Sequence, residues 1–410
     1  MVTAAQQPLT DISFESLGLD QRIVAVLSER GIEHPFPIQA QAVPDVLAGR
    51  DLCGKAKTGS GKTFAFGLPT LQRLVPGGGT PQALVLVPTR ELCVQVASEL
   101  RPFAKALGLS VAEVYGGVSI GDQIDQLRRG AEIVIATPGR LIDLQDRGAI
   151  RYDHVGIVIL DEADQMSDMG FMPQTEYIWR QVPEGHQSLL FSATLDGGID
   201  HLVARRLTEP VYCEVASTEV SVEQMEHRFL LVHYRDKVKV AARIALSTDK
   251  MLVFVHTKHG CDRVADALVA EGVQAAAIHG GLPQQKRQRE LNRFAQGSLS
   301  VLVATNVAAR GLDIEDVDVV MHYDPPSDSK TFLHRSGRTA RAGQAGMVVT
   351  LVEWDQEIPV RTLQNEAGLD HQMVKVYSND ERLDDLWSWE PPRRDLDAER
   401  TARRRSRRRR

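Results

Sequence analysis

The chain has 410 residues, enough for two or three domains, and its 43% apolar and 25% charged residues are typical of a soluble globular protein. No apolar run is long enough to span a bilayer, and residues 1–9 lack the basic and apolar regions of a secretory signal, so we expect neither kind of segment. The net charge of −6 is unevenly distributed along the chain. Residues 1–390 are acidic, with 38 basic and 51 acidic residues, whereas the tail at 391–410 has ten Arg and three acidic residues. Such a tail predicts contact with a polyanion, or else a disordered, solubilising end.

The first residues, 1–11, are predicted to be flexible. An amphipathic helical pattern follows at residues 23–27 and a second one at 39–47. The four cysteines are far apart and have no metal-type spacing, which is typical of reduced thiols in a cytoplasmic protein. They are Cys53, Cys93, Cys213 and Cys261.

The next stretch, at residues 56–63, predicts a phosphate-binding loop that opens a helix. It reads Ala56, Lys57, Thr58, Gly59, Ser60, Gly61, Lys62 and Thr63. The two glycines let several backbone N–H groups face one anion, and the helix start adds a positive dipole. Lys62 is expected to reach the β- and γ-phosphates and Thr63 to hold Mg²⁺. A plain Gly/Ser turn would not need Lys and Thr directly after its last glycine, although Ala56 stands where this pattern usually has Gly.

Short apolar runs then alternate with helical patterns, which predicts parallel strands of an open α/β sheet. The runs lie at 83–87, 111–115, 132–136, 155–160 and 188–192. Residues 208–226 interrupt this alternation, and we predict a linker at 214–225. The alternation resumes at 229–233, 251–256, 274–279, 300–304, 317–322 and 347–352. We therefore predict one α/β domain at 12–213, a second at 226–370 and a polar, Arg-rich tail, disordered at least from 391, at 371–410.

Two adjacent carboxylates, Asp161 and Glu162, directly follow the run at 155–160. Open α/β sheets bind ligands at the carboxyl ends of their strands. An Asp at that position suits Mg²⁺, and a neighbouring Glu can activate the attacking water. A helix N-terminus also favours acids, but it does not explain this placement together with a phosphate loop upstream.

At this point the chain resembles the DEAD-box RNA helicases, which are named after the sequence Asp161-Glu162-Ala163-Asp164. The other motifs of that family occur in the family's order over roughly residues 12–355. They are residues 35–39 with Phe14 upstream, 88–92, 116–117, 137–140, 192–194, 253–258, Gln284 with Arg287, 304–313 and 334–343. The resemblance implies two tandem RecA-like domains. The chain departs from the family's pattern at Ile32, where an aromatic residue is usual, and at Phe36, where Thr is usual. It also has Asn306, where the family often has Asp, and Phe332, where Tyr is common.

The roles of the nucleotide-site residues follow from this resemblance. Gln39 is expected to read the adenine edge, so that ATP binds better than GTP, and Phe14 to stack on the base. Lys62 and the loop hold phosphates, Thr63 and Asp161 organise Mg²⁺, and Glu162 activates water. From the second domain, the resemblance implies a ribose contact, two arginines at the γ-phosphate and a coupling histidine. These are Asp313, Arg338, Arg341 and His334.

The resemblance also implies RNA contacts by phosphate and sugar, largely independent of base sequence. The implied contacts are Pro88, Thr89, Arg90, Gly117, Thr137, Gly139, Arg140, Thr257, Gln284, Arg287, Thr305 and Gly311. For Thr257, a hydroxyl that merely caps a helix is an equal alternative. Ser192 and Thr194 resemble the motif that couples ATP hydrolysis to unwinding.

The resulting hypothesis is an ATP-dependent RNA helicase that binds a single strand or short duplex and couples ATP hydrolysis to local strand separation or RNA–protein remodelling. Hydrolysis should require the two domains to close around ATP and RNA. An ATP-gated RNA clamp that serves as an assembly scaffold is the alternative, and a DNA translocase is a weaker third reading. Ribosomal or RNA-decay proteins are candidate partners.

Overall fold

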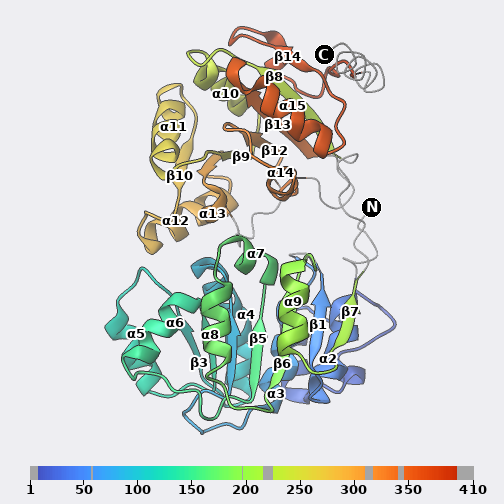
Figure 1. Ribbon diagram of the computed structural model, residues 1–410, viewed down its shortest axis with the longest axis vertical. Coiled ribbons are helices and arrows are strands. Elements are labelled where there is room, and N and C mark those ends of the chain that lie inside the picture. Colours follow the sequence, from blue (N-terminus) through green and yellow to red (C-terminus); the bar gives the residue numbers. More distant parts are fainter. Residues whose placement is uncertain are drawn as a thin grey trace, which may run out of the picture. The chain divides into compact units, whose positions relative to one another are not determined.

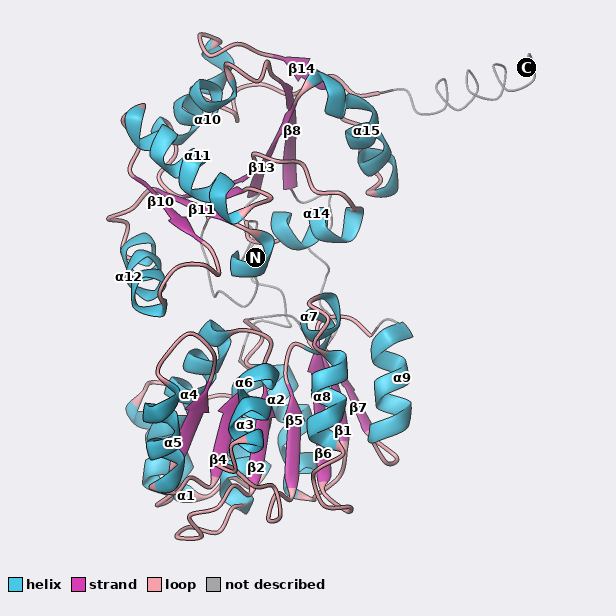
Figure 2. Ribbon diagram, turned by 60° about the vertical axis from the view of Figure 1, so that its left-hand side comes forward, coloured by secondary structure: helices cyan, strands magenta, loops and turns pink. Residues whose placement is uncertain are grey.

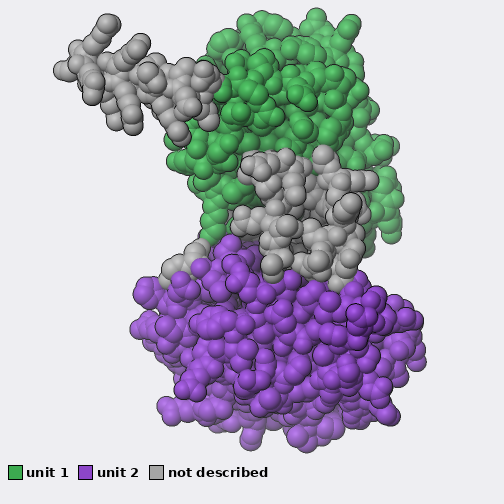
Figure 3. Space-filling model, turned by 90° about the vertical axis from the view of Figure 1, so that its right-hand side faces the viewer, with its two compact units in different colours: residues 1, 219–309, 314–410 green, residues 2–218, 310–313 purple. Residues whose placement is uncertain are grey.

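The computed structural model describes residues 8–56, 59–195, 197–215, 225–309, 317–339 and 346–394. These residues form two compact units, one within 8–215 and one within 225–394, which Figure 3 colours separately. Each unit is an α/β layer structure with its own sheet and its own hydrophobic core (Figures 1 and 2).

The first unit is built on a sheet of seven parallel strands in the order β3-β4-β2-β5-β6-β1-β7 (Figure 1). The strands are β1 Leu52–Lys55, β2 Ala83–Leu86, β3 Val111–Val114, β4 Ile133–Ala136, β5 Ile157–Leu160, β6 Gln187–Ser192 and β7 Val211–Glu214. All five apolar runs predicted as strands in this half are confirmed, with small differences at their ends.

Strand β7 was not predicted, because residues 208–226 were interpreted as an interruption that ends in a linker. Val211–Glu214 instead pairs in parallel with β1 at the edge of the sheet. Only one of its four residues is buried, so its sequence lacks the continuous apolar character of the inner strands. The predicted linker at 214–225 therefore begins one residue inside β7, and its residues 216–224 lie outside the described part of the chain.

Helices cover both faces of this sheet. They are η2 Glu15–Leu17, α1 Gln21–Glu29, α2 Pro37–Leu47, α3 Lys62–Arg73, α4 Arg90–Ala106, α5 Ile120–Arg128, α6 Pro138–Asp146, α7 Ala163–Asp168, α8 Met172–Trp179 and α9 Gly197–Arg206. Figure 2 shows these helices packed against the strands.

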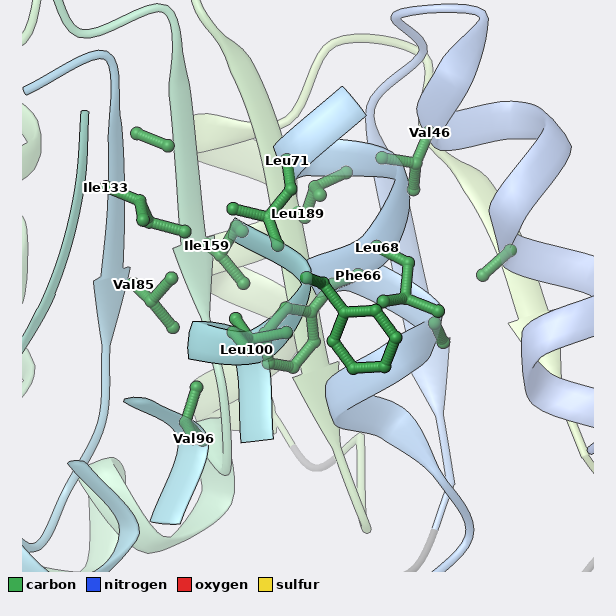
Figure 4. Packing of buried hydrophobic residues seen from close by; sticks show 14 of the residues in the cluster. Val46, Phe66, Leu68, Leu71, Val85, Val96, Leu100, Ile133, Ile159 and Leu189 are labelled. Atoms are coloured by element: carbon green, nitrogen blue, oxygen red, sulfur yellow. The ribbon is translucent and has the colours of Figure 1, made fainter. Parts of the chain in front are cut away.

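The core of the first unit is divided by its sheet into two apolar layers. Alternate strand residues point to opposite faces. Val85 and Ile159, for example, pack with α1 to α4, whereas Leu84 and Leu160 pack on the other face with side chains of α6 to α9. Figure 4 shows the first layer, in which Phe66 and Leu100 meet the strand residues. Burial on both faces explains why the inner strands read as unbroken apolar runs.

The second unit has the same design, with seven parallel strands in the order β10-β11-β9-β12-β13-β8-β14. The strands are β8 Met225–Leu231, β9 Met251–Phe254, β10 Ala275–Ile278, β11 Val301–Ala304, β12 Val319–His322, β13 Gly346–Val352 and β14 Met373–Lys375. The helices are α10 Lys237–Leu246, α11 Lys258–Ala270, α12 Gln284–Ala295, α13 Asn306–Ala309, α14 Ser329–Ser336, η4 Trp354–Gln356, α15 Glu357–Glu366 and η5 Glu381–Leu383. The six predicted strands of this half are confirmed.

The second unit extends to residue 394, which corrects the predicted boundary at 370. Strand β14 pairs with β8, and Leu383 and Leu386 are buried in the second unit's core. Arg228 on β8 is 1% exposed and donates to the carbonyl oxygens of Leu386 (3.1 Å) and Trp389 (2.7 Å). The segment has a polar composition and no apolar run, so the sequence did not predict that it belongs to this unit. It is held by backbone pairing and by hydrogen bonds from one buried guanidinium.

The N-terminal boundary also lies earlier than predicted. Within the predicted flexible end at 1–11, the N–H of Leu9 already donates to the carbonyl of Pro35, and residues 1–7 lie outside the described chain. All four cysteines are buried and carry free thiols. Among the described residues, every helix is too short or too polar to cross a bilayer.

Candidate nucleotide and RNA site

The phosphate loop joins β1 to α3, and its described part is shaped by two glycines. Gly59 and Gly61 have φ values of +79° and +84°, in the region that favours glycine, and Gly61 directly precedes the first residue of α3. Ala56 is buried, and its N–H continues the β1–β6 ladder by donating to the carbonyl of Ser192. Lys57 and Thr58, predicted loop residues, lie outside the described part of the chain.

Gln39 links α2 to this loop. Its side-chain Nε2 donates to the carbonyl of Gly61 (3.0 Å), and its Oε1 accepts from the N–H of Phe36 (2.8 Å). A Cβ at Gly61 would lie 2.4 Å from Nε2, so this contact itself requires glycine. Gln39, whose amide is predicted to read adenine, is thus 2% exposed and hydrogen-bonded to the phosphate loop.

Phe14, the residue predicted to stack on adenine, is buried. Its side chain is 2% exposed and belongs to the apolar layer that contains α1 to α4. The ring packs in this layer, and its stacking on adenine stays a prediction.

The carboxylates after β5 meet the lysine of the phosphate loop. Strands β5, β6 and β1 are neighbours in the sheet, so their carboxyl ends lie together. Lys62 Nζ lies 2.7 Å from Glu162 Oε1, and the side chains of this ion pair are only 6% and 3% exposed. Glu162 has a φ of +52°, rare for a residue with a side chain, and strain of this kind is often found at functional sites.

These buried charges shift each other's pKa values. Burial is the largest effect on Asp161; together with the nearby carboxylate of Glu162 it raises the pKa of Asp161 to about 7, although Lys62 opposes the shift. Burial and Glu162 also raise the pKa of Asp164. Burial alone would lower the pKa of Lys62, but the carboxylates of Glu162 and Asp161 outweigh it and raise that pKa. The site is therefore an excess of carboxylates around one cation, an arrangement suited to a further cation.

Three further hydrogen bonds tie the carboxylate motif to its surroundings. Ser192 at the end of β6 accepts from the N–H of Asp164 (3.3 Å) and donates to the carbonyl of Thr194 (2.6 Å). This places the two predicted coupling residues directly beside the carboxylate motif. Gln165 Nε2 donates to Glu162 Oε2 (3.0 Å), a contact that was not predicted. The only signal in the sequence was an amide three residues after Glu162, which is one turn along a helix.

The predicted RNA contacts of the first unit gather at the carboxyl ends of β2, β3 and β4, which are neighbours in the sheet. Arg90 lies against Gly117, where a Cβ would come within 2.1 Å of the guanidinium. Arg140 donates to the carbonyl of Val118 (3.3 Å) and to Gln123 Oε1 (3.0 Å). Pro88, Thr137 and Gly139 lie in the same loops or helix starts, and Thr89 caps α4 through its hydroxyl.

In the second unit, the predicted contacts lie in the loops and first helical turns after β9, β10 and β11. Thr257 accepts from the N–H of Gly260 (2.9 Å), so it does cap α11. Gln284 and Arg287 are buried in the first turn of α12, and Thr305 directly follows β11.

The predicted γ-phosphate and coupling residues of the second unit are only partly described. His334 lies in the last turn of α14 and Arg338 just after it, and both are half-buried. Asp313, Arg341 and the predicted RNA contact Gly311 lie outside the described residues. Arg335, which was not predicted, is 3% exposed and donates to Asn306 Oδ1 (2.6 Å) and to the carbonyl of Asp324 (2.9 Å). It connects two of the second unit's motifs.

Each of the two α/β units is built on a parallel sheet, and the first unit has a phosphate loop that faces paired carboxylates. These features define a nucleotide-hydrolysing protein of the RecA-like class. A sequence profile of the DEAD/DEAH box helicases matches residues 36–202, and one of the helicase conserved C-terminal domain matches residues 236–343. The chain belongs to the DEAD-box ATP-dependent RNA helicases.

Individual relatives agree with this assignment. The DEAD-box ATP-dependent RNA helicase CshA of Bacillus subtilis (strain 168) is 39% identical over 375 residues, which cover 91% of this chain and 76% of the relative. S. cerevisiae Dbp5 bound to RNA and ADP BeF3 has a TM-score of 0.78 at 29% identity, covering 91% of this chain and 98% of that one. Mss116p bound to ssRNA and AMP-PNP has a TM-score of 0.77 at 26% identity, covering 92% and 82%. The protein is thus an ATP-hydrolysing enzyme that binds RNA, and the predicted RecA-like fold is confirmed.

Proposed function

We propose that this helicase hydrolyses ATP with Lys62 as the phosphate-binding cation and Glu162 as the base that activates water. The buried Lys62–Glu162 ion pair carries this proposal, because it brings the two groups that such a reaction needs within 2.7 Å of each other. Before ATP binds, each group satisfies the other's charge. When Lys62 turns to the β- and γ-phosphates, the Glu162 carboxylate is released to accept a proton from water.

A divalent cation, Mg²⁺, fits the donors beside this pair. The Asp161 carboxylate is a hard oxygen donor at the end of β5, and Thr63 offers a hydroxyl in the first turn of α3. The described residues contain no cluster of three or more His, Cys, Asp or Glu side chains arranged around a metal. Mg²⁺ keeps several waters and is usually held by one or two carboxylates and the substrate's phosphates. The ion would neutralise phosphate charge, while Asp161 and Thr63 would hold it.

For RNA, we propose that the loops after β2, β3 and β4 grip phosphate and sugar. Arg90 and Arg140 supply cationic groups there, and neither makes an ion pair shorter than 3.9 Å within the described residues. Contacts to phosphate and sugar carry no base information, so base sequence should contribute little to binding. In the second unit, Thr257, Gln284, Arg287 and Thr305 are proposed as further contacts, and His334 and Arg338 as residues that respond to the γ-phosphate.

The test is the steady-state ATPase rate with and without single-stranded RNA. Lys62→Ala should lose ATP affinity, whereas Glu162→Gln should keep ATP and RNA binding and lose turnover by a factor of about 10² or more. Undiminished hydrolysis by Glu162→Gln would remove Glu162 from its role. Duplex release, compared with RNA residence time on a non-hydrolysable ATP analogue, distinguishes strand separation from clamping.

A further inference from the structure

Gln165 holds the carboxylate that the proposed mechanism uses as its base. It lies in α7, three residues after Glu162, and is 7% exposed. Its Nε2 donates to Glu162 Oε2 (3.0 Å), while Lys62 lies 2.7 Å from the other oxygen, Oε1. The two oxygens of one carboxylate are thus held by donors from two different helices, α7 and α3.

The orientation of the Gln165 amide is dictated by chemistry. If the amide were reversed, its oxygen would face the Glu162 carboxylate oxygen, and two acceptors would repel each other. With Nε2 directed at Glu162, the Gln165 Oε1 is buried and has no hydrogen-bond partner in the described part of the chain. A buried, unpaired amide oxygen costs about 1–3 kcal/mol. A leucine of similar size would avoid that cost, so packing alone does not account for an amide here.

The two donors differ in what happens when ATP arrives. Lys62 leaves Glu162 for the phosphates in the proposed mechanism, and the carboxylate then loses the hydrogen bond from the Lys62 ammonium. Gln165 is neutral and comes from the same short helix that Glu162 begins, so its contact does not depend on Lys62. A neutral amide donor orients the ionised carboxylate. A second cation in its place would also lower the pKa of the carboxylate and make it a weaker base.

We infer that Gln165 is a positioning residue that keeps the Glu162 carboxylate in place for water activation after Lys62 has turned to ATP. The inference rests on the proposed role of Glu162. Within the described residues, the side-chain hydrogen bond of Gln165 is to the base and not to the nucleotide-binding loop, so its loss should change turnover and leave ATP affinity alone. A base displaced by about 1 Å costs up to a factor of about 10² in rate.

The experiment compares Gln165→Leu and Gln165→Glu with the wild-type full-length chain in RNA-stimulated ATPase assays. Gln165→Leu removes the donor, and Gln165→Glu keeps the shape but sets an acceptor against an acceptor. Both should lower kcat by about 10- to 100-fold while KM for ATP and the Kd of a non-hydrolysable analogue change by less than about twofold. The control is Gln145→Leu at the end of α6, whose Oε1 is equally buried and unpartnered and which lies outside the proposed site. It should retain wild-type turnover.

A double variant separates this inference from the proposed function. Because Gln165 acts through Glu162, single-turnover rates of Glu162→Gln/Gln165→Leu should equal those of Glu162→Gln alone. If Glu162→Gln hydrolyses ATP normally, the proposed function fails. If Glu162→Gln is inactive but Gln165→Leu turns over like the wild type, the positioning role alone is wrong. A fall in kcat with an equal loss of analogue affinity would also overturn it, since that pattern reports a damaged fold.

Discussion

Asp161→Asn should stabilise the nucleotide-free first unit while it ends ATP hydrolysis. Asp161 is 2% exposed, and burial, with the nearby Glu162 carboxylate, raises its pKa from 3.8 to about 7. The ionised form is therefore disfavoured in the folded state. Asparagine has the same shape, can still accept the hydrogen bond from the N–H of Glu162, and carries no charge. It removes an electrostatic cost that the functional site imposes on the fold.

The size of the effect follows from the two pKa values. They differ by about three units, and each unit corresponds to about 1.4 kcal/mol, so the cost of ionised Asp161 is at most about 4 kcal/mol. Because the folded pKa lies above the unfolded one, this cost is absent near pH 4, grows as the unfolded state loses its proton, and is complete above pH 7. Asp161→Asn should therefore gain most at pH 8 and least at pH 4.

Thermal unfolding in EDTA without nucleotide measures this difference. For a unit of about 200 residues, 1 kcal/mol shifts Tm by about 2–4 °C, so we expect a rise of roughly 5–15 °C at pH 8 and less than half of that at pH 5. Asp168→Asn, which neutralises an exposed carboxylate of the same helix α7, should change Tm little. A lower Tm for Asp161→Asn at pH 8, or a gain that does not depend on pH, would refute the reasoning.

Three further predictions concern the C-terminal part of the chain. Arg228→Met should destabilise the second unit by about 2–4 kcal/mol in urea unfolding, because two charge-assisted hydrogen bonds that hold residues 386–389 are lost; an unchanged midpoint would contradict this. Residues 395–410 lie beyond the packed segment and contain eight Arg. Removing them should reduce the slope of log affinity for RNA against log salt concentration by about 0.7 per lost phosphate contact, and should spare basal ATPase. An equal slope would show that the tail does not contact phosphates. Burial, with Arg393 nearby, lowers the pKa of His371 to about 4, so the second unit should lose stability as pH falls from 6.5 to 4; His371→Gln should flatten this loss, and parallel pH profiles for the two proteins would contradict it.

The inner strands and the order of the motifs could be read directly from the chain. An inner parallel strand is buried on both faces, so it must be apolar throughout, and that requirement is visible in a run such as Ile157–Leu160. A phosphate loop must likewise carry its glycines, lysine and threonine in consecutive positions, because the backbone curl and the helix start are local features. The family and its ATP- and RNA-dependent activity followed from such local patterns.

Edge strands and side-chain partners could not be read in this way. Strands β7 and β14 are short and partly polar, and they exist because β1 and β8 offer unpaired backbone groups beside them. The Lys62–Glu162 pair joins residues 100 positions apart, and it depends on a strand order that places β1 next to β6 and β6 next to β5. The burial of Phe14 arises for the same reason, whereas the contact of Gln165 with Glu162 spans only one helical turn. Which side chains share a space is set by packing between distant segments, and no local pattern of residue types encodes it.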